Sequence, residues 1–157
     1  VEVTQLSLYL KMLEGENRDR LREQAELFRG EALLPPLSAN IKTGNSIISS
    51  DFSLEPDELI RVRAFDWDEG FPDIMANGGF HSVVGNPPYI LMQSIDDKAG
   101  FSYLAGHYRS ATYKIDTYQV FLEQAVKLTR NGGRVGMITP NTFLRNKHAE
   151  SLRLALL

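Results

Sequence analysis

The sequence predicts an α/β fold with a mostly parallel sheet. Two short apolar runs, residues 80–84 and 134–139, have the length and composition of buried strands. Segments whose apolar residues recur every three or four positions, residues 1–14 and 116–130, have the spacing of helices. Strands that alternate with helices form parallel sheets. The 157 residues are enough for one domain with its own core.

The first half of the chain contains further expected elements. Val3, Leu6, Leu10 and Leu13 give the first helix an apolar face. Four more segments follow from the spacing of apolar residues and from turn residues. They are a helix over residues 18–31, a strand and turn over 41–48, a loop over 49–58 and a short strand over 59–64.

The second half is marked by clearer start and stop signals. Asp116 is placed to cap the helix that follows it, and glycines at 132 and 133 are placed to end that helix. The expected elements are a helix over 68–76 closed by residues 77–79, a strand over 80–84, a long loop over 90–113, a helix over 116–130, a strand over 134–139 and a helix from 144 onward.

The composition excludes several classes of protein. Cysteine is absent, so the chain holds no disulfide and no zinc–thiolate site. The three histidines lack the spacing of metal ligands, and no metal site is predicted. No apolar run is long enough to span a bilayer, and no signal peptide is visible. A cytoplasmic protein that binds no membrane is the simplest interpretation.

The most informative segment is Gly85-Asn86-Pro87-Pro88-Tyr89, directly after the expected strand at 80–84. An amine on an aromatic base is a weak nucleophile, because its lone pair is delocalised into the ring. Two acceptors on its two N–H groups would draw that lone pair out of the plane and stabilise the charge that develops. Asn86 offers a side-chain carbonyl and Pro87 a backbone carbonyl, and the prolines hold both before a substrate arrives.

These residue types predict a catalytic role for Asn86, Pro87 and Tyr89. The Tyr89 ring offers a face on which a base can stack, an interaction typically worth ~1–3 kcal/mol. Pro88 and Tyr89 are the predicted substrate contacts.

The charge distribution points to a polyanionic partner. The net charge is −3, but residues 1–102 carry nine Lys and Arg against 17 Asp and Glu, whereas residues 103–157 carry eight against three. A basic flank that follows a base-holding turn suits a phosphate backbone. An ordinary solvated surface remains the alternative for any single basic residue.

The Asn-Pro-Pro-Tyr string resembles the signature of adenine-N6 DNA methyltransferases, and the order of motifs is similar to that of the large bacterial restriction-modification enzymes. The other segments that carry the resemblance are residues 1–14, 44–46, 114–123 and 131–144. One departure is His81, which stands where that family usually has an acidic residue. We expect His81 to be a surface or strand residue.

The resemblance implies a partial Rossmann-like methyltransferase sheet and the cofactor S-adenosylmethionine. The glycine-rich turn after the first strand and the acidic residue that ends the second strand of such enzymes do not appear in the sequence. We therefore expect the first two strands to be absent, the cofactor site to be incomplete, and residues 1–157 to form the central-to-C-terminal part of one methyltransferase catalytic domain. Open sheet edges invite pairing, so we expect the isolated chain either to rearrange locally or to self-associate through those edges.

Several residues have two readings. Asn45 resembles a contact to the cofactor's adenine and equally an ordinary turn residue. Asp66 is a second cofactor candidate, although a helix cap ahead of Asp68 is favoured. Asn86 would lie near the transferred methyl group and serve both cofactor and base. Asn141 and Thr142 resemble a motif near the base pocket, but hydrogen bonding at a strand end explains them equally well.

The long loop at 90–113 carries tyrosines at a five-residue spacing. With Arg109 and Lys114 they could line a nucleic-acid surface, but packing of the loop onto its own domain is favoured. These tyrosines are Tyr103, Tyr108 and Tyr113.

Three functions follow from these observations. The first is part of an adenine-N6 DNA methyltransferase that flips adenine out of double-stranded DNA. The second is a methyltransferase for glutamine side chains of a protein, which also uses Asn-Pro-Pro-Tyr. The third is a non-catalytic, DNA-contacting scaffold segment. The basic C-terminal part favours DNA, and we expect the isolated chain to have little or no activity.

Overall fold

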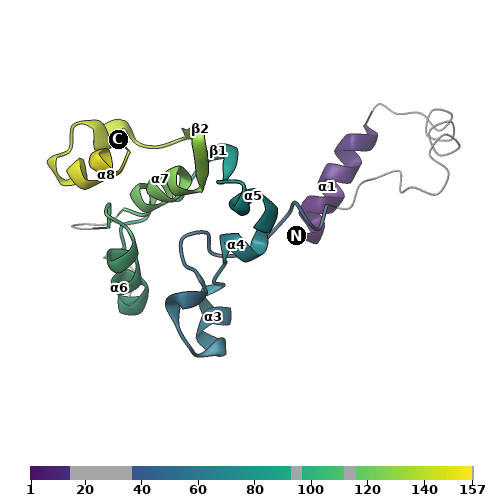
Figure 1. Ribbon diagram of the computed structural model, residues 1–157, viewed down its shortest axis with the longest axis horizontal. Coiled ribbons are helices and arrows are strands. Elements are labelled where there is room, and N and C mark those ends of the chain that lie inside the picture. Colours follow the sequence, from purple (N-terminus) through teal and green to yellow (C-terminus); the bar gives the residue numbers. More distant parts are fainter. Residues whose placement is uncertain (15–36, 93–96, 112–115, 157) are drawn as a thin grey trace, which may run out of the picture. The chain divides into compact units, whose positions relative to one another are not determined.

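The computed structural model describes residues 1–14, 37–92, 97–111 and 116–156. It contains two compact units, Val1–Thr43 and Gly44–Leu157. In the first unit, helix α1 spans Glu2–Leu13 and confirms the helix predicted for residues 1–14 (Figure 1). The Tyr9 hydroxyl accepts a hydrogen bond from the Leu37 amide at 3.4 Å. The helix predicted over 18–31 lies outside the described residues.

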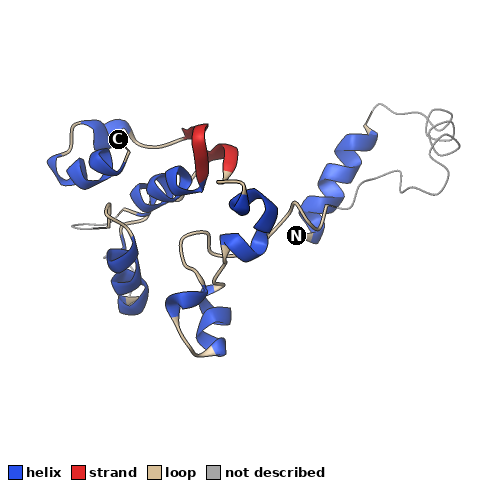
Figure 2. Ribbon diagram, viewed as in Figure 1, coloured by secondary structure: helices blue, strands red, loops and turns tan. Residues whose placement is uncertain are grey.

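The second unit is α/β and confirms the predicted fold class. Strands β1 (Phe80–Gly85) and β2 (Thr129–Met137) pair in parallel, and helix α7 (Thr117–Leu128) packs against both of them (Figure 2). This arrangement is a partial Rossmann-like sheet. The other helices are α3 (Pro56–Val62), α4 (Trp67–Gly70), α5 (Pro72–Ala76), α6 (Lys98–His107) and α8 (Glu150–Ala155), with short 3₁₀ helices η1 (Ser50–Phe52), η3 (Asn141–Leu144) and η4 (Lys147–Ala149).

The register of the sheet brings the carboxyl ends of both strands to one edge. Val83 lies opposite Val135, and Gly85 lies opposite Met137. One more ladder bond follows, from the Ile138 amide to the Gly85 carbonyl at 3.0 Å. The segments that leave β1 and β2 therefore start side by side.

Helix α7 begins where the sequence predicts and ends earlier. Asp116 caps it by accepting a hydrogen bond from the Tyr118 amide, and burial raises the pKa of that carboxyl. The helix ends at Leu128, and the Thr129 backbone is already extended. Residues 130–133 form an irregularity in the pairing, in which Gly132 has a φ of +76°. The glycines at 132 and 133, predicted to end the helix, therefore lie within the irregular first part of β2. Regular pairing begins at Arg134, where the strand was predicted to start.

Two predicted strands are wrong. Over 41–48 there is only an isolated parallel bridge between Asn45 and Ala64, because a strand without a neighbour has no ladder to complete. The segment predicted as a strand over 59–64 lies largely in α3, because Pro56 at the first helical turn and the acidic residues after it favour a helix start. Apolar residues that alternate along the sequence do not share one face of a helix, and Ile60 of α3 is therefore exposed.

The other helices predicted in this unit and the strand at 80–84 are confirmed, but the predicted loop over 49–58 is wrong in part, because it contains η1 and the start of α3. The predicted helix over 68–76 forms as α4 and α5, interrupted before Pro72, and closes at Asn77 with two positive-φ glycines after it. The described part of the segment predicted as a loop over 90–113 contains the helix α6, which Asp97 caps through the Gly100 amide. The C-terminal helical region is divided among η3, η4 and α8. His81 is an exposed strand residue, as predicted.

Two clusters of apolar side chains hold the second unit together. The buried core joins the 45–48 segment, α6 and α7; its members are Ile47, Ile48, Met92, Leu104, Tyr108, Ala111 and Val120. A second cluster consists of four aromatic rings whose centroids lie 5.1–6.3 Å apart, and it joins α4 and α5 to the start of β1. Its rings are Phe65, Trp67, Phe71 and Phe80.

Candidate active site

The turn after β1 presents the two predicted acceptors in different ways. Asn86 is exposed, and its Oδ1 atom lies 3.4 Å from the Tyr89 hydroxyl, which is long for a hydrogen bond between oxygens. Pro87 is buried, yet its carbonyl receives no hydrogen bond from the described residues. Both oxygens therefore keep acceptor capacity.

Tyr89 is fixed at its hydroxyl and half-exposed at its ring. The hydroxyl donates a hydrogen bond of 2.7 Å to the Ile138 carbonyl. The ring meets Tyr118 edge-on, with centroids 6.1 Å apart, and the residue remains 49% exposed. The aromatic surface predicted for stacking is thus held in place beside the acceptor pair.

An apolar cavity of about 250 Å³ adjoins the turn. Asn86, Pro87 and Pro88 form one wall, and Phe121 of α7 and Trp67 contribute to the others. The cavity is also lined by Ser46, Val83, Val84, Gly85, Gln124, Ala125, Leu128 and Met137. Sites for small ligands typically span ~300–1,000 Å³ and have mostly apolar walls with a few polar groups. The volume of this cavity lies just below that range, and its mostly apolar walls with a few polar groups match that kind of site.

The two further cofactor candidates are both engaged in local structure. Asn45 Oδ1 accepts a hydrogen bond from the Ile47 amide at 3.3 Å, the bond of an Asx turn, while its neighbour Ser46 lines the apolar cavity. Asp66 caps α4 through the Asp68 amide at 3.0 Å, which confirms the favoured reading of that residue. Contacts from Asn45 and Asp66 to a cofactor stay predictions.

The second motif lies at the same edge of the sheet. Asn141 and Thr142 are exposed and begin η3, three residues after Ile138. The Thr142 carbonyl accepts hydrogen bonds from the amides of Arg145 and Asn146. A contact of either side chain to a base stays a prediction.

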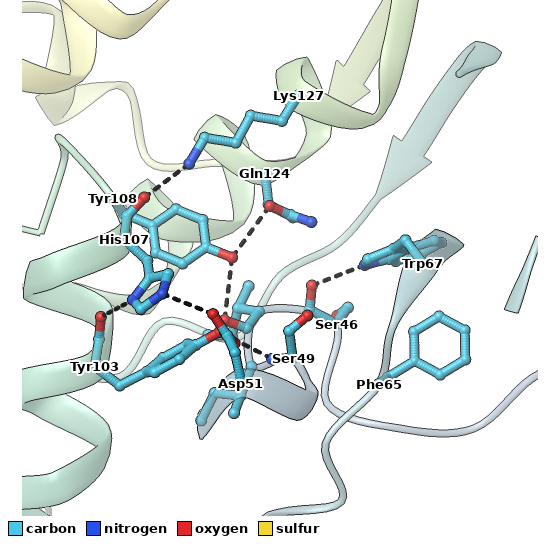
Figure 3. A pocket seen from close by; sticks show the side chains of 12 residues that line it. Ser46, Ser49, Asp51, Phe65, Trp67, Tyr103, His107, Tyr108, Gln124 and Lys127 are labelled. Atoms are coloured by element: carbon cyan, nitrogen blue, oxygen red, sulfur yellow. Dashed lines mark hydrogen bonds and ion pairs between the residues drawn. The ribbon is translucent and has the colours of Figure 1, made fainter. Parts of the chain in front are cut away.

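Figure 3 shows a second, polar cavity of about 190 Å³. This cavity shares Ser46, Trp67 and Gln124 with the apolar cavity. The Tyr103 hydroxyl donates to Asp51 at 2.6 Å and accepts from the Ser49 amide at 3.1 Å. His107 Nε2 lies 3.1 Å from the other oxygen of Asp51.

The polar groups around this second cavity are already paired with each other. The Tyr108 hydroxyl lies 3.0 Å from the Ile47 carbonyl and 3.1 Å from Gln124 Oε1, and Lys127 Nζ lies 4.1 Å from the centre of the Tyr108 ring. These bonds fix the 45–51 segment against α6 and α7.

The electrostatics match this structural role. Burial and the hydrogen bond to Asp51 raise the pKa of Tyr103 to about 12. The Tyr103 hydroxyl in turn lowers the pKa of Asp51. Burial also raises the pKa of Tyr108. Packing of Tyr103 and Tyr108 onto their own domain is therefore confirmed, whereas Tyr113 and Lys114 lie outside the described residues.

Sequence reasoning missed several residues that the fold brings to the turn. Trp67 and Gln124 line the apolar cavity, and Thr117 forms hydrogen bonds on both sides of Tyr89. Phe121 of α7 lines the same cavity. No local signal distinguishes such residues, because their role depends on which element packs against the turn.

The described residues contain neither a metal site nor a membrane-spanning helix. Among them, no group of three or more His, Asp or Glu side chains is arranged to hold a metal ion. Likewise, no helix in residues 1–14, 37–92, 97–111 or 116–156 is both long and apolar enough to cross a membrane.

Comparison with known proteins gives a consistent result. The chain is 28% identical over 148 residues to the type II restriction enzyme and methyltransferase RM.Eco57I of Escherichia coli, which covers 93% of this chain. It is 27% identical over 107 residues to the type II methyltransferase M.BstVI of Geobacillus stearothermophilus, covering 68% of this chain. It is 33% identical over 104 residues to the adenine-specific methyltransferase PglX of Streptomyces coelicolor, covering 61% of this chain.

The matched segment is a small part of each relative. It spans 13%, 16% and 8% of their respective lengths. No solved structure matches the chain. The family model described as Eco57I restriction-modification methylase matches residues 1–157. The chain, with its Asn-Pro-Pro-Tyr turn at the edge of a parallel sheet, therefore belongs to the Eco57I restriction-modification methylase family.

Proposed function

We propose that this chain is the central-to-C-terminal part of the catalytic domain of an adenine-N6 DNA methyltransferase in a restriction-modification system. The observation that carries the proposal is the acceptor pair of Asn86 and Pro87, whose oxygens keep free capacity beside an apolar cavity of about 250 Å³. The adenine-specific relative supports the choice of base.

In this proposal, the chain's own residues hold and polarise the target amine. Asn86 Oδ1 and the Pro87 carbonyl accept the two N–H groups of a flipped adenine, which draws its lone pair toward the reacting carbon. Tyr89 covers the base with its exposed ring surface. Cytoplasmic location and contact with double-stranded DNA are part of the same proposal.

S-adenosylmethionine, when bound, would supply the methyl group. The apolar walls at Pro88, Trp67 and Phe121 fit its adenine ring and would exclude water from the transfer site. Asn45 and Asp66 are the further candidates for contacts to it. Because the glycine-rich turn is absent from these residues, we expect the isolated chain to be inactive and the full-length protein that carries it to be active.

The test is methyl transfer by the full-length protein to duplex DNA and to a glutamine-containing peptide. We expect labelled methyl groups on adenine in DNA and none on the peptide. Asn86→Ala should lower kcat by ~10²–10³ or more, the typical cost of removing one such polar group, and leave the circular dichroism spectrum unchanged. Transfer to the peptide alone would establish the glutamine alternative. Binding of DNA without any transfer would establish the scaffold alternative.

Self-association through open sheet edges is a separate proposal. In the described part of the chain β1 pairs only with β2, so its other edge carries unpaired backbone groups. We expect the isolated chain to associate as its concentration rises. Light scattering that shows a monomer over a wide concentration range would contradict this.

A further inference from the structure

The Asn86–Tyr89 turn has fewer backbone donors than an ordinary four-residue turn. Proline has no N–H group, so Pro87 and Pro88 remove two adjacent donors from the chain. The nearby backbone groups left to anchor it include the Pro88 carbonyl and both polar groups of Ile90.

Thr117 forms hydrogen bonds with all three of them. Its hydroxyl donates to the Pro88 carbonyl at 2.6 Å and accepts from the Ile90 amide at 3.1 Å. Its own amide donates to the Ile90 carbonyl at 3.0 Å. A hydroxyl is the smallest side-chain group that both donates and accepts, which is what this gap between two backbone groups requires.

Thr117 is also held rigidly itself. It is 5% exposed and is the first residue of α7, which Asp116 caps and which packs against both strands. Its β-branched side chain has few allowed rotamers. Its amide belongs to the first turn of the helix, where backbone donors have no partner within the helix, so the bond to Ile90 does not compete with α7.

We propose that Thr117 is a positioning residue for base methylation, and that its hydroxyl sets the place of Tyr89 and of the acceptor pair relative to the sheet. The inference rests on the proposed function and deepens it by assigning a residue outside the Asn-Pro-Pro-Tyr string. Tyr89 is then fixed from two directions, by Thr117 through its flanking backbone and by Ile138 at its hydroxyl.

The test compares Thr117→Val with Thr117→Ser in the full-length protein. Valine keeps the shape and the bond from the backbone amide but loses both hydroxyl bonds, whereas serine keeps them. We expect Thr117→Val to lower kcat by ~10- to 100-fold, since a displacement of about 1 Å can cost that much. The KM for S-adenosylmethionine should change by a smaller factor than kcat, and Thr117→Ser should restore most of kcat.

Hydrogen exchange supplies a readout besides activity. The peptide that contains the Ile90 amide should exchange faster in Thr117→Val and at the wild-type rate in Thr117→Ser. Thr129→Val is the matched control, because Thr129 at the other end of α7 also donates its hydroxyl to a backbone carbonyl, that of Ala125, at 2.7 Å. This variant should retain wild-type kcat.

The outcomes separate the inference from the function on which it rests. A wild-type protein that transfers no methyl group to DNA contradicts the proposed function. An active wild type with an equally active Thr117→Val variant overturns the inference alone. It is likewise overturned if Thr117→Ser is as impaired as Thr117→Val, or if exchange at the Ile90 amide is unchanged in Thr117→Val.

Discussion

The Tyr89 hydroxyl donates a hydrogen bond of 2.7 Å to the carbonyl oxygen of Ile138. Tyr89 follows β1 and Ile138 follows β2, so this bond joins the two segments that leave the carboxyl edge of the sheet. It also occupies the hydroxyl hydrogen, which leaves Asn86 Oδ1, 3.4 Å away, free to accept from another donor. The bond from Tyr89 to Ile138 thus leaves Asn86 Oδ1 available to a substrate.

Tyr89→Phe and Tyr89→Ala should separate the hydroxyl from the ring. Phenylalanine loses the bond to Ile138 but keeps the stacking surface, so base binding should weaken by less than ~1 kcal/mol. Alanine also loses the ring and should weaken base binding by ~1–3 kcal/mol. Titration of the full-length protein with DNA that carries a fluorescent base analogue at the target position measures both.

Cofactor binding is the internal control for this pair. Neither variant should change the dissociation constant for S-adenosylmethionine by more than about twofold, because the Tyr89 side chain does not line the apolar cavity. Equal base binding by the alanine variant and the wild type would contradict the stacking role.

Glu123→Gln should destabilise the protein. The buried Glu123 carboxylate accepts hydrogen bonds from the amides of Arg109 at 3.2 Å and Ser110 at 2.8 Å, and pairs with Lys127 at 3.1 Å. Burial opposes its ionisation, but the bonds from Ser110 and its neighbours outweigh burial and hold the pKa below the ordinary 4.5. Glutamine loses the charge and one acceptor, at a cost of ~1–3 kcal/mol in the free energy of unfolding.

The pH dependence of that loss has a definite sign. Because the pKa of Glu123 is lower in the folded state, its contribution is complete above pH 4.5 and disappears as the pH falls through the folded-state value. The wild type and Glu123→Gln should therefore converge in stability below about pH 4.5 in urea denaturation at fixed protein concentration. Glu150→Gln, at an exposed position of α8, is the control and should change stability by less than ~0.5 kcal/mol. A constant difference between wild type and Glu123→Gln across the acid range would contradict the assignment.

The three glycines at 78, 79 and 106 should respond differently to alanine. Gly79 has a φ of +107°, and a Cβ there would lie 2.5 Å from the Leu128 carbonyl oxygen, so Gly79→Ala should cost ~1–3 kcal/mol or more. Gly78 has a φ of +87° but open space around it, so only the backbone strain applies. Gly106 lies inside α6 with open space, and Gly106→Ala should stabilise by ~0.5–1 kcal/mol. Urea denaturation followed by circular dichroism gives the order, and a Gly79→Ala variant more stable than Gly78→Ala would contradict this account.

Much of the second unit could be predicted from local signals. The apolar run of β1, the cap at Asp116 and the spacing in α7 each depend on neighbours in sequence, and each forms as expected. The predicted strand over 59–64 failed for a local reason, since alternation over a few residues does not outweigh a helix start at Pro56. The predicted strand over 41–48 failed for a non-local reason, since the residues that would pair with it are not in position.

The candidate site shows the same division. Asn86, Pro87 and Tyr89 could be named from the sequence, because the restricted backbone of consecutive prolines and the chemistry of a weakly nucleophilic amine are properties of the residues themselves. Thr117 and Trp67 could not, because a threonine at the start of a helix and a tryptophan after an aspartate are common in any fold.

By itself, the sequence determined the α/β class, the position of the Asn-Pro-Pro-Tyr turn at a strand end and the family to which the chain belongs. Tertiary structure alone decided that Tyr89 is tied to Ile138, that Thr117 holds the backbone on both sides of Tyr89, and that α7 forms a wall of the adjoining cavity. The physical reason is the distance along the sequence over which each kind of interaction acts. Backbone preferences and caps act over a few residues, whereas these hydrogen bonds join groups 27 to 49 positions apart and exist only once β1, β2 and α7 have packed together.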